Sequence, residues 1–152
     1  MTTDPPRLHN SCYKQDVYKS KKQREKEAKS NKAVGIAGEN TAIVEICAQM
    51  GRKPGKKDRR VNQGGEGGGL SRPDFIIDGL EGCFNENKVQ ARFEFTSFWE
   101  QLFENCPLFH IPYLTYRQAL KAPLFIMLEV KNLNEFCMRF LVAAGYDVIP
   151  RD

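Results

Sequence analysis

The sequence has few of the residues on which most enzyme classes depend. Its only histidines are His9 and His110, and its five cysteines are widely spaced, with no Cys-x-x-Cys pair. We therefore expect neither a histidine-based catalytic site nor a structural zinc, whose ligands are clustered in the sequence. An odd number of scattered cysteines indicates reduced, mostly buried thiols in a reducing compartment rather than a disulfide framework.

Long apolar segments are also missing. The longest apolar run, 123–128, is far shorter than the ~20 residues of a membrane-spanning helix. The first ten residues contain no apolar stretch, so we expect no secretory signal and an intracellular protein, cytoplasmic or nuclear. The glycine-rich stretch 64–69 is not followed by Lys-Ser/Thr, which argues against a Walker-type phosphate loop.

Positive charge is concentrated in the N-terminal part of the chain. Residues 1–62 hold 15 Lys/Arg against 7 Asp/Glu, whereas residues 63–152 hold 8 against 12. Such a surplus attracts polyanions, so we expect a nucleic acid as the partner and no membrane. Part of this charge lies in a Lys-rich arm at 14–32. The rest lies in a loop at 52–60, whose cations we expect to hold the phosphate backbone: Arg52, Lys53, Lys56, Lys57, Arg59 and Arg60.

The hydrophobic pattern predicts a flexible basic arm at 1–33 and one α/β domain at 34–152. Helical spacing of apolar residues predicts helices at 35–50, 97–104, 114–121 and 133–144. Apolar and β-branched runs predict strands at 74–79, 89–95, 123–130 and 146–149, with 123–130 buried at a central position. This order predicts a mixed central sheet flanked by helices.

Carboxylates are the side chains with the clearest chemical potential. Asp74 opens a predicted strand directly after Pro73, and Glu94 lies late on the predicted antiparallel partner. In a hairpin, the start of one strand faces the end of the next, so we expect the two carboxylates side by side. Two close carboxylates repel unless a cation lies between them, which predicts a Mg²⁺ (or Mn²⁺) site.

The pattern resembles the PD-(D/E)xK nuclease superfamily, particularly archaeal-type Holliday junction resolvases and virus-type replication-repair nucleases. Over residues 35–130, Glu39 matches the glutamate of the first helix, Pro73-Asp74 the Pro-Asp, Glu94-Phe95-Thr96 the (D/E)xK and Gln118 the helical glutamine. The resemblance implies a restriction-endonuclease-like αβββαβ core, metal ligation by Glu39, Asp74 and Glu94, a DNA substrate and a homodimer.

The match departs from the family at Thr96, where the family has a lysine that activates water and stabilises charge on the phosphate. Lys131 is our candidate replacement, because it ends the strand expected beside the third strand. Two alternatives stay open: Glu129-Val130-Lys131 is itself the motif, or Thr96 marks a site that binds without catalysis.

These observations predict a metal-dependent nuclease that hydrolyses phosphodiester bonds in DNA, acting on branched or replication-repair intermediates. Glu39, Asp74, Glu94, Gln118 and Lys131 are the expected catalytic residues. One rival is a non-catalytic nucleic-acid-binding protein on the same fold. Another is an interaction protein that uses its basic arm on an acidic partner.

Overall fold

The computed structural model describes residues 20–61 and 72–149 and divides the chain into two units, Met1–Lys32 and Ala33–Asp152. The described residues of the first unit form the beginning of helix α1 (Lys21–Gln49), and all of them are exposed. A capping box starts this helix: the Gln23 amide N–H donates to Ser20 Oγ (3.3 Å), and the Ser20 N–H donates to Gln23 Oε1 (2.9 Å). The described part of the Lys-rich arm, residues 20–32, is therefore an exposed helix from Lys21 onwards.

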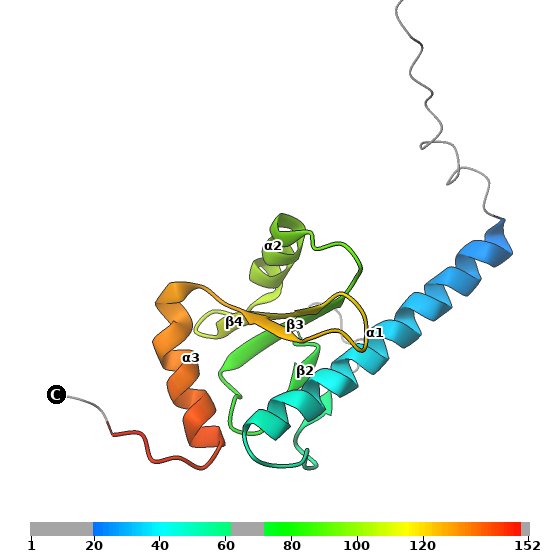
Figure 1. Cartoon of the computed structure of the whole chain (residues 1–152). Coiled ribbons are helices and arrows are strands. Elements are labelled where there is room, and N and C mark those ends of the chain that lie inside the picture. Colours follow the sequence, from blue (N-terminus) through cyan, green and yellow to red (C-terminus); the bar gives the residue numbers. More distant parts are fainter. Residues whose placement is uncertain (1–19, 62–71, 150–152) are drawn as a thin grey trace, which may run out of the picture. The chain divides into compact units, whose positions relative to one another are not determined.

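The second unit continues α1 and then alternates strands and helices (Figure 1). The elements that follow α1 are β1 (Arg59–Arg60), β2 (Phe75–Ile76), β3 (Cys83–Val89), α2 (Phe95–Asn105), β4 (Ile111–Arg117), β5 (Phe125–Met127) and α3 (Val130–Ala143). Strands β1 and β2 pair antiparallel, β3 and β4 pair parallel, and β5 pairs antiparallel with β4. This arrangement confirms the predicted mixed α/β class, but the described strands form two small sheets, β1-β2 and β3-β4-β5, in place of one central sheet, and the nuclease core stays a prediction.

Two hydrophobic clusters lie on the opposite faces of β3 and β4. Because side chains alternate along a strand, Cys83 and Tyr113 face one way while their neighbours Phe84 and Leu114 face the other. The first cluster packs against α1 and α3, and the second packs against Phe98 and Leu102 of α2. Helix α2 is also the crossover that the parallel pairing of β3 with β4 requires.

The helices predicted at 35–50, 97–104 and 133–144 are confirmed, although each begins earlier than expected. The early start of α1 has a simple cause, since the charged residues before position 35 are good helix formers that lack an apolar stripe. No helix in the described ranges is long and apolar enough to cross a bilayer.

The strand predictions were less accurate. The strand predicted at 89–95 is wrong, because the strand is Cys83–Val89 and α2 begins at Phe95. The helix predicted at 114–121 is also wrong, because Ile111–Arg117 is β4, with all seven residues buried. A strand buried on both faces lacks the polar-apolar alternation by which strands are recognised, and its apolar spacing was misread as helical.

The strand predicted at 123–130 is shorter and lies at an edge. Strand β5 comprises only Phe125–Met127, its Phe125 is 56% exposed, and Val130 begins α3. The apolar run therefore does not reflect burial on both faces. Residues 146–149 form no strand, and the glycine-rich stretch 62–69 lies outside the described residues.

Candidate active site

Asp74 is a partly buried carboxyl group whose pKa is raised well above its ordinary value. It lies directly before β2, where its backbone N–H donates to the Asn85 carbonyl (3.0 Å) and its carbonyl accepts from the Val61 N–H (2.9 Å). Its side-chain Oδ2 accepts the Asn87 N–H (2.6 Å). Burial, followed by the neighbouring Glu86 carboxylate, raises the pKa of Asp74 to about 7. Asp74 therefore sits in a low-dielectric, negatively charged environment.

Strand β3 supplies two further charged side chains. Glu86 is 6% exposed, and its Oε1 accepts from Lys88 Nζ at 2.6 Å. The same ammonium group donates to Gln101 Oε1 of α2 (2.8 Å) and lies 5.6 Å from the centre of the Phe98 ring. Glu86 and Lys88 are two residues apart in one strand, so they share a face. Their partners hold the lysine in place on that face.

Helix α1 contributes Glu39 through a close approach to β3. A Cβ on Gly38 would lie 2.3 Å from Val89 Cγ2 and 3.4 Å from Asn87 Nδ2, so only glycine permits this packing distance. The next residue, Glu39, adds to the negative charge that raises the pKa of Asp74, and its carboxylate forms an ion pair with Arg60. The Gly38-Glu39 pair thus combines close packing with a carboxylate directed to the site.

The donor chemistry fits a small divalent cation. Glu39, Asp74 and Glu86 offer only carboxylate oxygens, which are the ligands that Mg²⁺ and Mn²⁺ prefer. In residues 20–61 and 72–149, no three His, Cys, Asp or Glu side chains lie close enough to form a complete metal site. Mg²⁺ is commonly held by one or two protein carboxylates, with water and substrate phosphate oxygens completing the shell. Asp74 and Glu86 fit that incomplete kind of site.

The structure brings together only two of the five predicted catalytic residues, Glu39 and Asp74. Glu94 is exposed at the N-cap of α2 rather than on a strand, so the predicted hairpin pairing with Asp74 is wrong. Gln118 is exposed directly after β4, which ends at Arg117. Lys131 lies in the first turn of α3, 69% exposed, with its Nζ 2.7 Å from Glu129 Oε2. Thr96 belongs to α2.

The sequence reasoning missed Glu86 and Lys88, although a signal was present. Glu86-Asn87-Lys88 has the (D/E)xK spacing and lies on the strand that follows Pro73-Asp74 and β2. The segment was overlooked because Asn, Glu and Lys are depleted in strands. Pairing with β4 and the hydrogen bond from Asp74 nevertheless hold it extended. Lys88 is thus a lysine beside Glu86, whereas Thr96 lies in α2 and Lys131 in α3.

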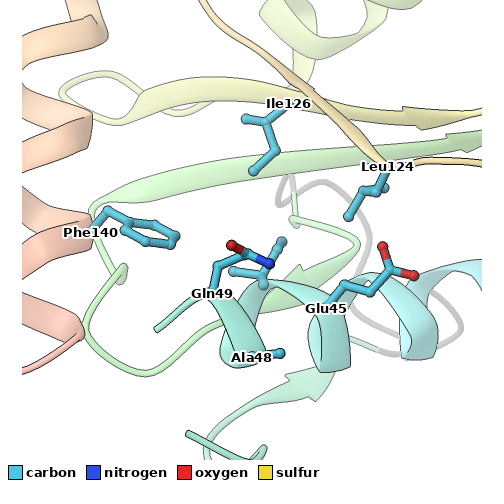
Figure 2. A pocket seen from close by; sticks show the side chains of 7 residues that line it. Glu45, Ala48, Gln49, Leu124, Ile126 and Phe140 are labelled. Carbon is cyan, nitrogen blue, oxygen red and sulfur yellow. The ribbon is translucent and has the colours of Figure 1, made fainter. Parts of the chain in front are cut away.

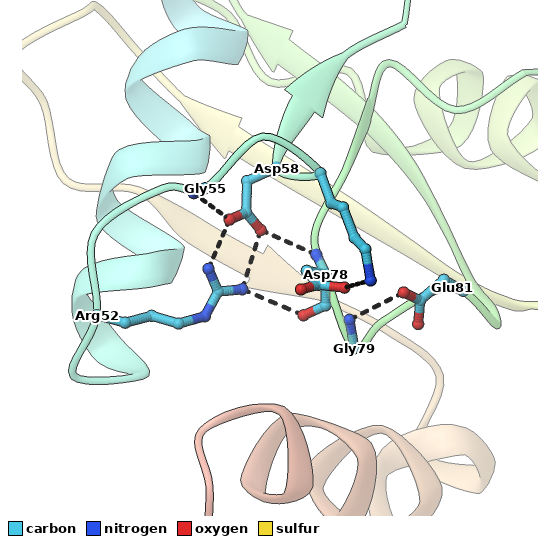
Figure 3. Close-up of polar contacts among 7 residues, drawn as sticks. Arg52, Gly55, Asp58, Asp78, Gly79 and Glu81 are labelled. Carbon is cyan, nitrogen blue, oxygen red and sulfur yellow. Dashed lines mark hydrogen bonds and ion pairs between the residues drawn. The ribbon is translucent and has the colours of Figure 1, made fainter.

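The basic loop at 52–60 contains more internal hydrogen bonds than we expected of a loop that binds phosphates (Figure 3). Arg52 donates to both oxygens of buried Asp58 (2.5 and 2.9 Å), and Asp58 also accepts N–H groups of Gly55 and Asp78 (2.6 and 2.9 Å). The Arg52 guanidinium holds the pKa of Asp58 well below its usual range. Arg52 therefore stabilises the loop.

The other cations of the predicted phosphate-binding set differ in availability. Arg60 pairs with Glu39, and Lys57 Nζ lies 3.2 Å from Asp78 Oδ1, although its side chain is 77% exposed. The remaining members of the set are exposed: Lys53, Lys56 and Arg59.

A cavity of about 260 Å³ lies elsewhere in the second unit (Figure 2). Its lining is largely apolar, with Glu45 and Gln49 as the polar members: Glu45, Ile46, Ala48, Gln49, Leu124, Ile126 and Phe140. Glu45 is engaged by fully buried Arg117, whose Nη1 donates to it at 3.0 Å. None of the candidate site residues lines this cavity.

Three kinds of comparison, with protein-family models, curated proteins and solved structures, find no match to this chain. The function must therefore be argued from the residues and their geometry.

Proposed function

We propose that this chain is a metal-dependent nuclease that hydrolyses phosphodiester bonds in DNA. The observation that carries the proposal is the grouping of Asp74 with Glu86, Glu39 and Lys88, in which burial and neighbouring carboxylates raise the pKa of Asp74 to about 7. Carboxyl groups with strongly raised pKa values occur at functional sites more often than elsewhere in proteins. The grouping also has the Pro-Asp and Glu-x-Lys pattern of the superfamily that the sequence resembles.

The order of the elements supports the same assignment. From α1 to β4 the chain runs α-β-β-β-α-β, which is the order of the superfamily core. Asp74 precedes the second strand, Glu86 and Lys88 lie on the third, and Glu39 lies on the first helix. Each residue thus stands on the element that the family pattern assigns to its role.

Each residue of the proposed site has a separate role in phosphodiester hydrolysis. Asp74 and Glu86 would hold a Mg²⁺ ion, with Glu39 adding negative charge nearby. When bound, such a metal polarises the scissile phosphate and makes hydroxide available near neutral pH. Lys88 would orient the attacking water and stabilise the negative charge that develops on the phosphate oxygens. Glu86 and Gln101 position its ammonium group, since they accept hydrogen bonds from it at 2.6 and 2.8 Å.

The exposed cations of the basic loop would bind the DNA backbone without reading sequence, because phosphates are the same at every position. Branched or replication-repair intermediates are the substrates that the resemblance implies. DNA is therefore preferred to RNA as the substrate.

A cleavage assay tests the proposal. The full-length protein is incubated with linear, flapped and four-way DNA in the presence of Mg²⁺ or Mn²⁺, and in parallel with EDTA. We expect cleavage that EDTA abolishes, and we expect Asp74→Asn and Glu86→Gln to reduce it by two or more orders of magnitude, as losses of catalytic electrostatics do. Glu94→Gln is the matched control, and it should retain activity.

The other outcomes separate the rival functions. Tight DNA binding with no cleavage of any substrate would refute the enzyme and leave a binding module. Failure to bind DNA or RNA would leave a protein partner for the basic arm. Cleavage that survives Glu86→Gln but is lost in Glu94→Gln would identify Glu94-Phe95-Thr96 as the motif, as the sequence predicted.

A further inference from the structure

A cavity of about 230 Å³ lies beside the candidate active site. We call it the Phe84 cavity, because Phe84 of β3, a side chain that is 1% exposed, contributes to its lining. Ile76 of β2 and Pro107 also line it, and its polar lining residues are Glu81 and His110. The cavity is smaller than the ~300–1,000 Å³ pockets that hold drug-sized ligands, so it suits a single ring system.

The Phe84 cavity and the proposed metal ligand Glu86 share one face of β3. Glu86 follows Phe84 by two residues, and side chains two residues apart in a strand point in the same direction. The two side chains are therefore about 7 Å apart along the strand. Pro73, which also lines the cavity, directly precedes Asp74. A phosphate group bound at Asp74 and Glu86 would thus lie next to the cavity.

Strand β2 approaches the cavity from the neighbouring segment. Phe75 and Ile77 belong to the first hydrophobic cluster, so Ile76, between them, faces the opposite side, where it lines the cavity. Asp74 lies two residues before Ile76, and its pKa is raised first by burial and then by the Glu86 carboxylate. The cavity is therefore two residues from a proposed metal ligand on each of the two segments.

The position and the charge of the cavity indicate which group it binds. In a nucleic acid, every backbone phosphate carries a base close by through its sugar, so a base comes within reach when a phosphate occupies the site. Bases bind aromatic side chains through their flat faces, and Phe84 provides such a side chain. The exposed Glu81 carboxylate repels a second phosphate but does not repel a neutral base. A base therefore fits the cavity better than a phosphate does.

His110 offers the base a hydrogen-bonding partner. Its Nδ1 lies 3.3 Å from the Leu108 carbonyl oxygen. Because a carbonyl oxygen only accepts hydrogen bonds, Nδ1 carries the proton, and Nε2 of the neutral ring is then an acceptor. Ring N–H and amino groups of a base are donors that this nitrogen can accept.

We propose that the Phe84 cavity binds one base that is unstacked from the DNA beside the phosphate that is cleaved. This inference rests on the proposed nuclease function, because the position of the bound phosphate defines the position of the base. A base in a duplex must leave the stack to enter the cavity, which costs least where the base is already unpaired. The cavity therefore gives the enzyme a preference for DNA with an unpaired nucleotide at the cut, as in flaps and mismatches.

Cleavage assays on matched DNA duplexes test the proposal. With the full-length protein in Mg²⁺, the cut is first mapped on the substrate that is cleaved fastest. Each of the two nucleotides that flank the cut is then made paired, mismatched or abasic in turn. For one of these nucleotides, we expect kcat/KM to be on the order of tenfold higher with a mismatched base than with a paired one, because the enzyme no longer has to unpair the base.

Two variants and one control test whether the cavity causes this preference. His110→Ala removes an exposed lining side chain, and Ile76→Trp fills the cavity from β2. Each should slow cleavage of the mismatched DNA on the order of tenfold, as the loss of the contacts of one base does. Neither should change cleavage of the abasic DNA, which has no base to bind, and this difference separates base binding from a general loss of structure. Phe109→Ala, which removes a 99% exposed side chain next to His110, should affect neither substrate.

The possible failures of the two proposals are distinguishable. Equal losses on mismatched and abasic DNA in both variants would overturn the base-binding role, as would equal wild-type rates on paired and mismatched DNA. In either case, cleavage that depends on Mg²⁺ and Asp74 would still support the nuclease. A protein that cleaves no DNA would refute the nuclease function, and the base-binding role with it.

Discussion

Removing the charge of Asp74 should stabilise the metal-free protein at the expense of its function. Asp74→Asn replaces a partly buried carboxylate by a neutral amide of the same shape. The amide oxygen can still accept the Asn87 N–H, which donates to Asp74 Oδ2 at 2.6 Å. The substitution therefore removes the desolvation cost and the repulsion by Glu86 while keeping the hydrogen bond.

The size of the effect follows from the pKa of Asp74, about 7 in the folded state against an ordinary value of 3.8. Each pKa unit corresponds to about 1.4 kcal/mol, so the ionised carboxylate destabilises the fold by an amount on the order of 4 kcal/mol at pH 8. A free-energy change of 1 kcal/mol shifts the melting temperature of a chain of this size by about 2–4 °C. Asp74→Asn should thus melt roughly 10 °C higher at pH 8, by that conversion.

The stability of the wild type should fall as the pH rises through the range in which Asp74 ionises. Below about pH 4 the carboxyl is protonated in both the folded and the unfolded states, so its ionisation contributes nothing. Between about pH 4 and 7 the unfolded chain releases the proton and the folded chain keeps it, and the wild type loses stability as the pH rises. The difference in melting temperature between Asp74→Asn and wild type should therefore grow from pH 4 to pH 8.

Thermal denaturation of both proteins in EDTA, across that pH range, measures this difference. Glu94→Gln is the control, since its exposed carboxylate should give no comparable trend. Addition of Mg²⁺ or Mn²⁺ at pH 8 should raise the melting temperature of the wild type more than that of Asp74→Asn, because binding to the folded state stabilises it. A flat difference across pH, or a less stable Asp74→Asn at pH 8, would refute the reasoning.

Three further predictions concern packing, the basic loop and DNA affinity. Gly38→Ala should cost about 1–3 kcal/mol and reduce cleavage because its Cβ would meet Val89 Cγ2, whereas Gly35→Ala, with no neighbour within 4 Å, should be neutral or slightly stabilising by denaturant titration. Asp58→Asn should cost about 1.5–3 kcal/mol at pH 7, because it weakens the hydrogen bonds that Arg52 donates to a buried carboxylate, and this penalty should shrink in acid, where wild-type Asp58 itself becomes protonated. Alanine substitutions of the exposed loop cations should weaken the salt dependence of DNA binding: Lys53, Lys56 and Arg59. For each phosphate contact removed, the slope of the logarithm of the binding constant against the logarithm of the salt concentration should fall in magnitude by about 0.9, without a change in sequence preference.

The sequence was most informative where a pattern is local. Apolar spacing located the three helices of residues 20–61 and 72–149, because a helix is defined by contacts three or four residues apart. Pro73-Asp74 and Gly38-Glu39 were recognised as short motifs, and the structure places Asp74 and Glu39 close enough for their charges to interact. The early start of α1 reflects helix propensity without an apolar stripe, whereas the strand boundaries depended on contacts that the local pattern does not contain.

The failures lie where tertiary pairing overrides local preference. Residues 85–88 belonged to no predicted element, yet they lie within β3, because β4 pairs with that strand along its whole length. Misplacing that strand directed the prediction to Glu94-Phe95-Thr96, whereas the motif that we propose, Glu86-Asn87-Lys88, contains a lysine. Strand β4 was misread for the opposite reason, since burial on both faces removes the alternation that marks a strand.

We propose that Lys88, rather than Lys131, orients the attacking water and stabilises the negative charge that develops on the phosphate. The direct test is the cleavage rate of Lys88→Met and Lys131→Met on the DNA substrate that the wild type cleaves best, in Mg²⁺, with DNA binding measured in parallel. The account predicts that Lys88→Met loses about 10²-fold or more in rate while still binding DNA, and that Lys131→Met cleaves like the wild type. A Lys88→Met protein that cleaves at the wild-type rate, or a loss confined to Lys131→Met, would contradict it.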